Sequence, residues 1–167
     1  MNDWESRATI AIKQQGKSTH ELWWLMARFG LYAYVIIVLG LAYLVTDKMR
    51  LADIVIPVFV AIVITLVIQQ VIRRPRPEHA RTTYDLWIHT FSFPSAHAST
   101  SFAAASSLSF VFLASSLSFA WVYVILFFLL AILIAISRIM VGVHHLFDVI
   151  AGSALGMLIS IILLSIG

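Results

Sequence analysis

The chain contains no cysteine, and only 11% of its 167 residues are charged. The absence of cysteine excludes disulfides, thiolate metal sites and cysteine nucleophiles. A soluble domain carries roughly 25% charged residues, so this chain has too few charges to cover a water-facing globule. A disordered chain would show the opposite balance, with few hydrophobic residues and a high net charge. Because 61% of the residues are hydrophobic, the composition indicates a multi-pass membrane protein.

Five long apolar segments approach or reach the roughly 20 residues that a helix needs to cross a bilayer. Lipid offers the backbone no hydrogen-bond partners, so we expect all five segments to be helices. The length of the chain allows a single domain, which spans residues 1–167. The sequence therefore predicts an all-α, polytopic membrane helix bundle with about five transmembrane helices. Their expected bounds are 29–45, 51–72, 97–117, 119–137 and 146–166.

Residues 1–28 differ from the rest, because they mix charged side chains with tryptophans and aliphatic residues. This segment is too polar to span a bilayer, and it lacks the apolar core and cleavage site of a signal peptide. Tryptophans are enriched at the depth of the lipid headgroups. We therefore expect an N-terminal amphipathic helix that lies in the membrane interface, with a frayed tail as the alternative.

Five crossings would place most of the basic residues on the same side of the membrane as the N-terminus. On the opposite side lie Lys48 and Arg50, two of the eleven Lys and Arg residues. The positive-inside rule makes the more basic side cytoplasmic. Several of its arginines are candidates for a functional site, however, and such charges are no guide to insertion. The orientation therefore stays open at this point.

Three polar clusters fall on that basic side, at residues 73–77, 93–97 and 137–148. Ionisable residues at membrane depth are costly and usually mark functional sites. In these clusters, Arg76 and Arg138 provide planar cationic groups that match phosphate oxygens. Ser95 precedes an expected helix, whose first N–H groups and dipole favour an anion. The clusters together predict a site for a phosphate group.

The third cluster also contains the elements of nucleophilic catalysis. Asp148 follows His144 by four residues and His145 by three, so its carboxylate can orient either imidazole. An oriented histidine can attack phosphorus, while His97 can protonate the leaving oxygen. Spacing alone does not choose between the adjacent histidines. Each residue also has a structural alternative, since arginines anchor helix ends at headgroups, serines cap helices and aspartates pair with arginines.

These clusters resemble the motifs of the type 2 phosphatidic acid phosphatase superfamily, which includes membrane lipid phosphate phosphatases and soluble vanadium haloperoxidases. The family's third motif, Ser-Arg-(five residues)-His-(three residues)-Asp, is complete over residues 137–148. Its second motif, Pro-Ser-Gly-His, appears over residues 94–97 with Ala96 in place of glycine. The first motif, Lys-(six residues)-Arg-Pro, is partial, because Gln69 stands at the lysine position. The similarity covers about residues 69–152, half of the chain.

The resemblance implies that His144 is the nucleophile and forms a phosphohistidine. It also implies that Asp148 orients this histidine and that His97 is the acid for the leaving group. No metal or other cofactor is implied. The phosphate would be held by Arg76, Ser95 and Arg138.

Two departures from the family pattern bear on phosphate binding. Ala96 keeps its backbone N–H, so we expect replacement of the glycine to have a small effect. Gln69 places a neutral amide where the family has a cation that would contact phosphate. Our hypothesis is that Arg73 or Arg74 supplies the missing charge. We therefore count Ala96, Gln69 and Arg74 among the candidate phosphate-binding residues.

The expected function is hydrolysis of a lipid phosphate or diphosphate at the surface of the cytoplasmic membrane, with no nucleic acid partner. On family analogy alone, a polyprenyl diphosphate such as undecaprenyl diphosphate ranks first, followed by phosphatidylglycerol phosphate, phosphatidic acid and a lipid A phosphate. Family members commonly carry six spans, so five leave a homodimer or an unusual N-terminal placement open. The alternative from another class is a non-catalytic lipid-binding or lipid-transport protein whose site has decayed, as Gln69 would suggest.

Overall fold

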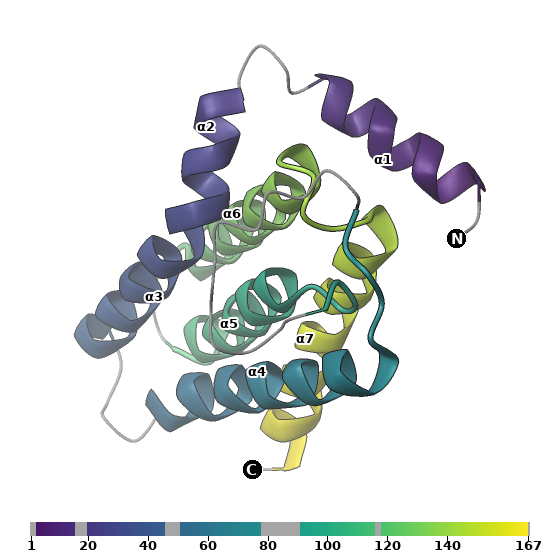
Figure 1. Cartoon of the computed structure of the whole chain (residues 1–167). Coiled ribbons are helices and arrows are strands. Elements are labelled where there is room, and N and C mark those ends of the chain that lie inside the picture. Colours follow the sequence, from purple (N-terminus) through teal and green to yellow (C-terminus); the bar gives the residue numbers. More distant parts are fainter. Residues whose placement is uncertain (1–2, 16–19, 46–50, 78–90, 116–117, 167) are drawn as a thin grey trace.

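The protein is an all-α bundle in the computed structural model (Figure 1). Helix α1 lies across one end of the bundle. The structure describes residues 3–15, 20–45, 51–77, 91–115 and 118–166. The elements are α1 Asp3–Gln15, α2 His20–Leu25, the π-helical turn η2 Met26–Gly30, α3 Leu31–Val45, α4 Ala52–Ile72, α5 Ala96–Leu113, α6 Ala120–Met140 and α7 Leu146–Ile166.

Helix α5 lies at the centre and packs against α4, α6 and α7 (Figure 1). Its sequence is rich in alanine and serine, and small side chains let helix backbones approach closely where lipid supplies no hydrophobic drive. On α7, Gly156 lies so close to α5 that an added Cβ would overlap the carbonyl oxygen of Ser99. The close contact of α5 and α7 fixes the positions of the first turns of both helices relative to each other. Both turns carry candidate site residues.

Four helical segments of the described chain are long and apolar enough to cross a membrane, and these are Glu21–Leu44, Ala52–Ile72, Ala120–Met140 and Leu146–Ile166. The prediction of a polytopic helical bundle is therefore confirmed, whereas the count of five spans is confirmed only in part. The expected span at 97–117 does form a helix, α5, but it is not one of these four. Its serines lower its hydropathy, and its neighbours bury most of its length.

The boundary expected at residue 28 is wrong. Helix α2, the η2 turn and α3 follow one another without a break, so the first candidate span begins at Glu21. The apolar residues 22–26 belong to this span and supply the length that residues 29–45 alone lack. Only α1 is a separate N-terminal helix, and it packs against α6 and α7. Its position in the membrane interface stays a prediction.

The fourth span is also longer than expected. Helix α6 continues to Met140, so Ser137 and Arg138 lie in its last turn rather than in the connection to α7. Only residues 141–145 connect the two helices. This short connection holds His144 and His145 close to the end of α6.

Candidate active site

Three segments that are remote in sequence meet at one end of the bundle. They are the stretch that follows α4, the stretch that leads into α5, and the connection between α6 and α7. The amide of Ser92 donates to the carbonyl of Arg74 at 2.9 Å, and the amide of Ser95 donates to the carbonyl of Asp148 at 2.9 Å. Arg76 Nη1 donates to the carbonyl of Val143 at 3.2 Å. These bonds tie the three polar clusters of the sequence into one site.

The connection between α6 and α7 turns sharply back on the end of α6. The amides of Val143 and His144 both donate to the carbonyl of Arg138, at 3.1 and 3.3 Å. Gly142 has a φ of 75°, a left-handed conformation that suits glycine. The turn therefore depends on Gly142, and it places His144 against the last turn of α6.

The imidazole of His144 is buried, and its closest partner is a backbone carbonyl. Its Nδ1 lies 2.8 Å from the carbonyl oxygen of Ser92 and 3.7 Å from Asp148 Oδ2. Since a carbonyl oxygen only accepts, Nδ1 carries the hydrogen in the neutral ring and Nε2 keeps its lone pair. Burial lowers the pKa of His144 to about 4; the nearby Arg138 and Arg76 act in the same direction, and Asp148 opposes it. The ring is therefore neutral near pH 7, as a nucleophile must be.

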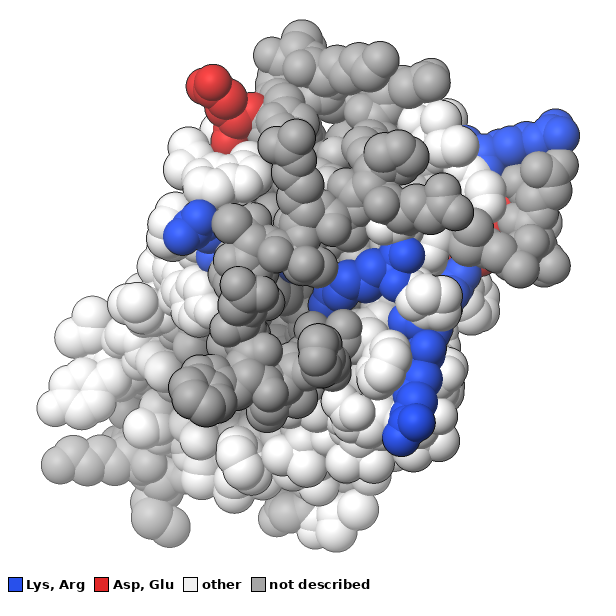
Figure 2. All heavy atoms as spheres, in the orientation of Figure 1, with Lys and Arg blue, Asp and Glu red and all other residues white. Residues whose placement is uncertain are grey.

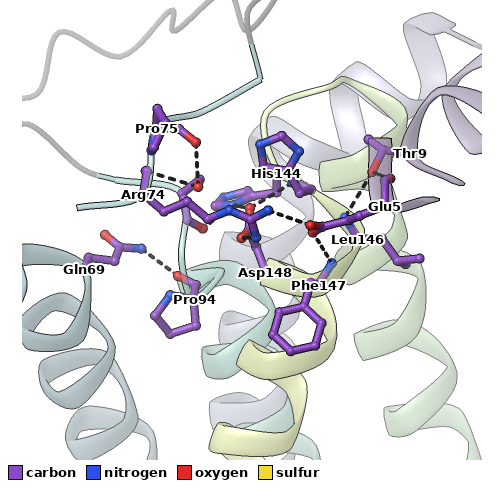
Figure 3. A network of polar contacts seen from close by, with 12 residues as sticks. Glu5, Thr9, Gln69, Arg74, Pro75, Pro94, His144, Leu146, Phe147 and Asp148 are labelled. Atoms are coloured by element: carbon purple, nitrogen blue, oxygen red, sulfur yellow. Dashed lines mark hydrogen bonds and ion pairs between the residues drawn. The ribbon is translucent and has the colours of Figure 1, made fainter. Parts of the chain in front are cut away.

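Asp148 is fully buried in the first turn of α7, and it binds more than one partner. Its Oδ2 accepts the backbone amide of His145 at 2.8 Å, and its Oδ1 lies 2.6 Å from Arg74 Nη1 (Figure 3). Asp148 therefore binds the backbone of His145 and not its imidazole. The imidazole near Asp148 is that of His144, whose Nδ1 lies 3.7 Å from Oδ2, beyond hydrogen-bond distance. The backbone carbonyl of Ser92 holds the His144 ring, a role that no side-chain pattern in the sequence could have indicated.

Two arginines, Arg138 and Arg76, act electrostatically on both His144 and His97. Arg138 is buried, and its Nη1 donates to the carbonyl of Ala27 in η2. Arg76 is half-buried, and burial lowers its pKa. At the start of α5, burial lowers the pKa of His97, and both guanidinium groups and the His144 ring act in the same direction. Figure 2 shows most of the visible blue side chains between the centre and the right side of the view, with a further one on the left.

The start of α5 offers groups suited to an anion. Ser95 directly precedes the helix in an extended conformation, and Ala96 and His97 form the first turn. The Oγ atom of Ser95 is buried and has no hydrogen-bond partner among the described residues. The first amides of a helix also lack intrahelical acceptors. A phosphate at this helix end would satisfy both kinds of donor, which fits the role that the sequence predicts for Ser95.

Gln69, which replaces the family's lysine, and the nearby Arg73 and Arg74 bind different partners. Gln69 is buried on α4, and its Nε2 donates to the carbonyl of Pro94 at 2.8 Å, so it braces the stretch before α5. Arg73 is exposed, and its Nε bonds back to the carbonyl of Gln70. Arg74 instead reaches Asp148 and Glu5 (Figure 3). Of the two arginines considered as substitutes for lysine, Arg74 is the one that enters the polar network.

The family's sequence profile, described as the PAP2 superfamily, matches residues 32–167. The chain belongs to the PAP2 superfamily. This confirms the resemblance that the motifs carry. A phosphatidylglycerolphosphate phosphatase of Bacillus subtilis has a similar structure, with a TM-score of 0.76 and 23% identity, covering 99% of this chain and 87% of that one. LpxE of Aquifex aeolicus gives a TM-score of 0.74 and 22% identity, covering 95% of this chain and 93% of that one.

A curated relative is more similar in sequence. The decaprenylphosphoryl-5-phosphoribose phosphatase of Mycobacterium tuberculosis is 36% identical over 110 residues. The match covers 65% of this chain and 56% of the relative. The chain thus spans little more than half of that protein's length. Together the comparisons place this chain in a family with the membrane lipid phosphate phosphatase fold.

Proposed function

We propose that this PAP2 protein is a phosphatase that removes phosphate from a membrane lipid. The observation that carries the proposal is the environment of His144. A buried neutral imidazole, held by Ser92 at Nδ1, keeps its Nε2 lone pair in a site surrounded by arginines. Such a group suits nucleophilic attack on a phosphate ester, whose negative charge the arginines would balance.

The reaction has two steps. In the first, His144 Nε2 forms a bond to phosphorus while the bond from phosphorus to the lipid oxygen breaks. His97, whose protonated form is favoured by the negative charge of the bound phosphate, gives a proton to that oxygen. In the second, a water molecule gives a proton to His97 and forms a bond to phosphorus while the bond from phosphorus to Nε2 breaks, which releases inorganic phosphate and restores both histidines. Arg76 and Arg138 stabilise the charge that spreads over the equatorial oxygens during transfer. Asp148 favours the positive charge that the imidazole gains, since opposite charges attract strongly at low dielectric.

The substrate class that we favour is a polyprenyl-linked phosphate. The sequence analysis ranks a polyprenyl diphosphate first, and the relative with 36% identity is named for a decaprenyl-linked sugar phosphate. Both substrates combine an anionic group with a long unsaturated tail. Phosphatidylglycerol phosphate, for which the structural relative from Bacillus subtilis is named, is an alternative within the same activity. Phosphatidic acid and a lipid A phosphate, which the sequence analysis also ranks, are the others.

The bundle has an apolar cavity that suits such a tail. The cavity has a volume of about 210 Å³ and lies between α3, α4 and α5. Its wall includes Ile62, seven residues before Gln69 on α4, which corresponds to roughly 10 Å along a helix. The lining residues are Val35, Val38, Leu39, Ile54, Val55, Val58, Phe59, Ile62 and Ala104.

The decisive experiment measures release of inorganic phosphate by the purified protein in lipid vesicles. Undecaprenyl diphosphate, a decaprenyl-linked phosphoribose, phosphatidylglycerol phosphate and phosphatidic acid are each supplied, with and without EDTA. We expect turnover of a polyprenyl-linked substrate that persists in EDTA and vanishes in His144→Ala. Turnover that survives this substitution contradicts the nucleophile, and turnover that requires a metal contradicts the metal-independent mechanism.

A second candidate function is lipid binding or transport without catalysis. Gln69 favours it, because a site that no longer transfers phosphate would lose cations first. Against it, the described site keeps both histidines and buries Asp148 against Arg74. Tight binding of lipid phosphates with no turnover of any of them would support this second candidate.

A further inference from the structure

The N-terminal helix α1 reaches the candidate site through a buried carboxylate, although no motif of the sequence includes it. Glu5 is 6% exposed. Its Oε2 lies 2.7 Å from Arg74 Nη2, and its Oε1 accepts the backbone amide of Phe147 at 3.3 Å (Figure 3). A buried carboxylate is costly unless it is paired and hydrogen-bonded. Glu5 meets both conditions, because Arg74 supplies the ion pair and the amide of Phe147, at the start of α7, supplies the hydrogen bond.

Thr9, one turn further along α1, binds the same end of α7. Its Oγ1 accepts the backbone amide of Leu146 at 3.3 Å and donates to the carbonyl of Glu5 at 2.9 Å. The first amides of a helix have no intrahelical acceptor, so the two side chains cap the first two residues of α7 from another helix. Asp148 is the third residue of α7. Helix α1 therefore holds the turn that carries Asp148.

The ion pairs of Arg74 with Glu5 and Asp148 also set the net charge next to His144. The guanidinium of Arg74 lies between two carboxylates, with Nη2 on Glu5 and Nη1 on Asp148. One cation is thus shared by two anions, and the three groups together carry a net negative charge. Without Glu5, the full positive charge of Arg74 would be balanced by Asp148, and the pair would have no net charge. With Glu5 present, Asp148 keeps an attractive potential toward His144, 3.7 Å away.

We propose that Glu5 is a positioning residue of this PAP2 site, which acts through Arg74 and the first turn of α7 to keep Asp148 oriented and charged toward His144. The inference rests on the proposed function, because it assigns Glu5 a part in that reaction. It also gives α1 a role beyond a membrane-surface anchor. The helix completes the site from outside the three motifs.

The central test is Glu5→Gln in the full chain, measured in lipid vesicles with the best substrate. Glutamine keeps the size of the side chain and an acceptor for the Phe147 amide, but it removes the charge. We expect kcat to fall about tenfold, as expected for about 1.4 kcal/mol of lost transition-state stabilisation. We expect KM to stay unchanged or fall, because removal of a negative charge does not weaken binding of an anion. A merely structural defect would raise KM as well.

Three further variants complete the design. Glu5→Asp restores the charge on a shorter side chain and should recover part of the lost kcat. Thr9→Val removes the cap on Leu146 but leaves the ion pair, so its effect on kcat should be smaller than that of Glu5→Gln. Glu21→Gln removes an exposed carboxylate on α2 and serves as the charge-matched control, with unchanged kcat.

The outcomes separate this inference from the proposed function. An unchanged kcat in Glu5→Gln, beside a loss of turnover in His144→Ala, overturns the role of Glu5 and leaves the phosphatase intact. If the unmodified protein turns over no lipid phosphate, the proposed function fails, and hydrogen exchange decides the placement of Glu5. The amide of Phe147, which Glu5 accepts, should exchange faster in Glu5→Ala than in the unmodified protein. Equal exchange rates would overturn the positioning role.

Discussion

Gly152 on α7 lies directly against the backbone of Ser95, so that a Cβ added to Gly152 would lie 2.5 Å from the Ser95 carbonyl oxygen and 3.2 Å from its amide nitrogen. The same amide donates to the carbonyl of Asp148, one turn earlier on α7. The absence of a side chain at Gly152 therefore sets how closely the start of α5, the proposed phosphate-binding end, approaches the helix that carries Asp148. Backbone atoms cannot move aside as the tip of a flexible side chain can.

We expect Gly152→Ala to lower both stability and activity. Overpacking of a tight contact costs about 1–3 kcal/mol, and here relief would move Ser95 away from Asp148. The thermal unfolding midpoint in detergent should fall, and kcat/KM should fall at least about tenfold. Gly40→Ala on α3 is the matched control, because an added Cβ there meets nothing within 4 Å. Alanine is favoured over glycine in a helix by roughly 0.5–1 kcal/mol, so this variant should be neutral or more stable. Equal behaviour of the two variants would contradict the close approach.

The protonation state of His144 gives a prediction that does not depend on substrate. Its pKa is lowered to about 4, chiefly by burial, so the ring should be neutral at pH 6, where an ordinary histidine is mostly charged. The 2.8 Å contact of Nδ1 with the Ser92 carbonyl requires the hydrogen on Nδ1. Nitrogen NMR of histidine-labelled protein, with His144→Ala to assign the signals, should show a neutral ring protonated at Nδ1. As the pH falls, charge should appear only near pH 4.

Two results would contradict this description of His144. A ring that is charged at pH 6 would mean that Asp148, which favours the charged form, dominates over burial. A neutral ring protonated at Nε2 would mean that Ser92 does not hold it. Either result would remove the free lone pair on which the proposed attack depends.

The motifs in the sequence predicted which residues meet, but not how they are held. His97, Arg138 and Asp148 come from segments that the motifs already marked, and their meeting at one end of the bundle follows from helices of similar length. The carbonyl of Ser92 and the carboxylate of Glu5 carry no such mark. A backbone carbonyl is present at every residue, and Glu5 lies 69 positions from the arginine that it binds. Contacts of this kind depend on tertiary packing, which local patterns do not encode.

The errors in the helix bounds have a similar origin. Hydropathy predicts which residues suit lipid, so it detected α4, α6 and α7 well. Helix α5 is surrounded by other helices, and its serines find partners there, such as Ser107 with Ser160 at 3.2 Å. A helix that contacts protein needs less hydrophobicity than one that contacts lipid. The first span was cut short because residues 1–28 were treated as one polar segment, whereas the structure continues the helix of the first span back to His20.

Gln69 invites a substitution that restores the family's cation. In Gln69→Lys, the ammonium can still donate to the Pro94 carbonyl that Gln69 Nε2 now binds at 2.8 Å. It would add positive charge beside Ser95, so we expect KM for the lipid phosphate to fall or turnover to rise. Gln69→Met fills the same space without a donor or a charge, and it should lower stability without lowering KM. Steady-state kinetics of both variants test the point. No change, or a loss of activity, in Gln69→Lys would show that the site has been rebuilt around the amide.

Arg138 tests whether shape or charge alone matters at the phosphate site. Its guanidinium is buried, and Nη1 donates to the carbonyl of Ala27. Lysine keeps the charge but lacks the planar fork that can bind that carbonyl and phosphate oxygens together. We expect Arg138→Lys to lower kcat/KM about a hundredfold, in line with the roughly 1.5–3 kcal/mol of a charge-assisted hydrogen bond. Arg73→Lys, at an exposed position that bonds back to its own helix, is the matched control and should leave kcat/KM unchanged. Comparable activity in the two variants would show that Arg138 acts only as a point charge.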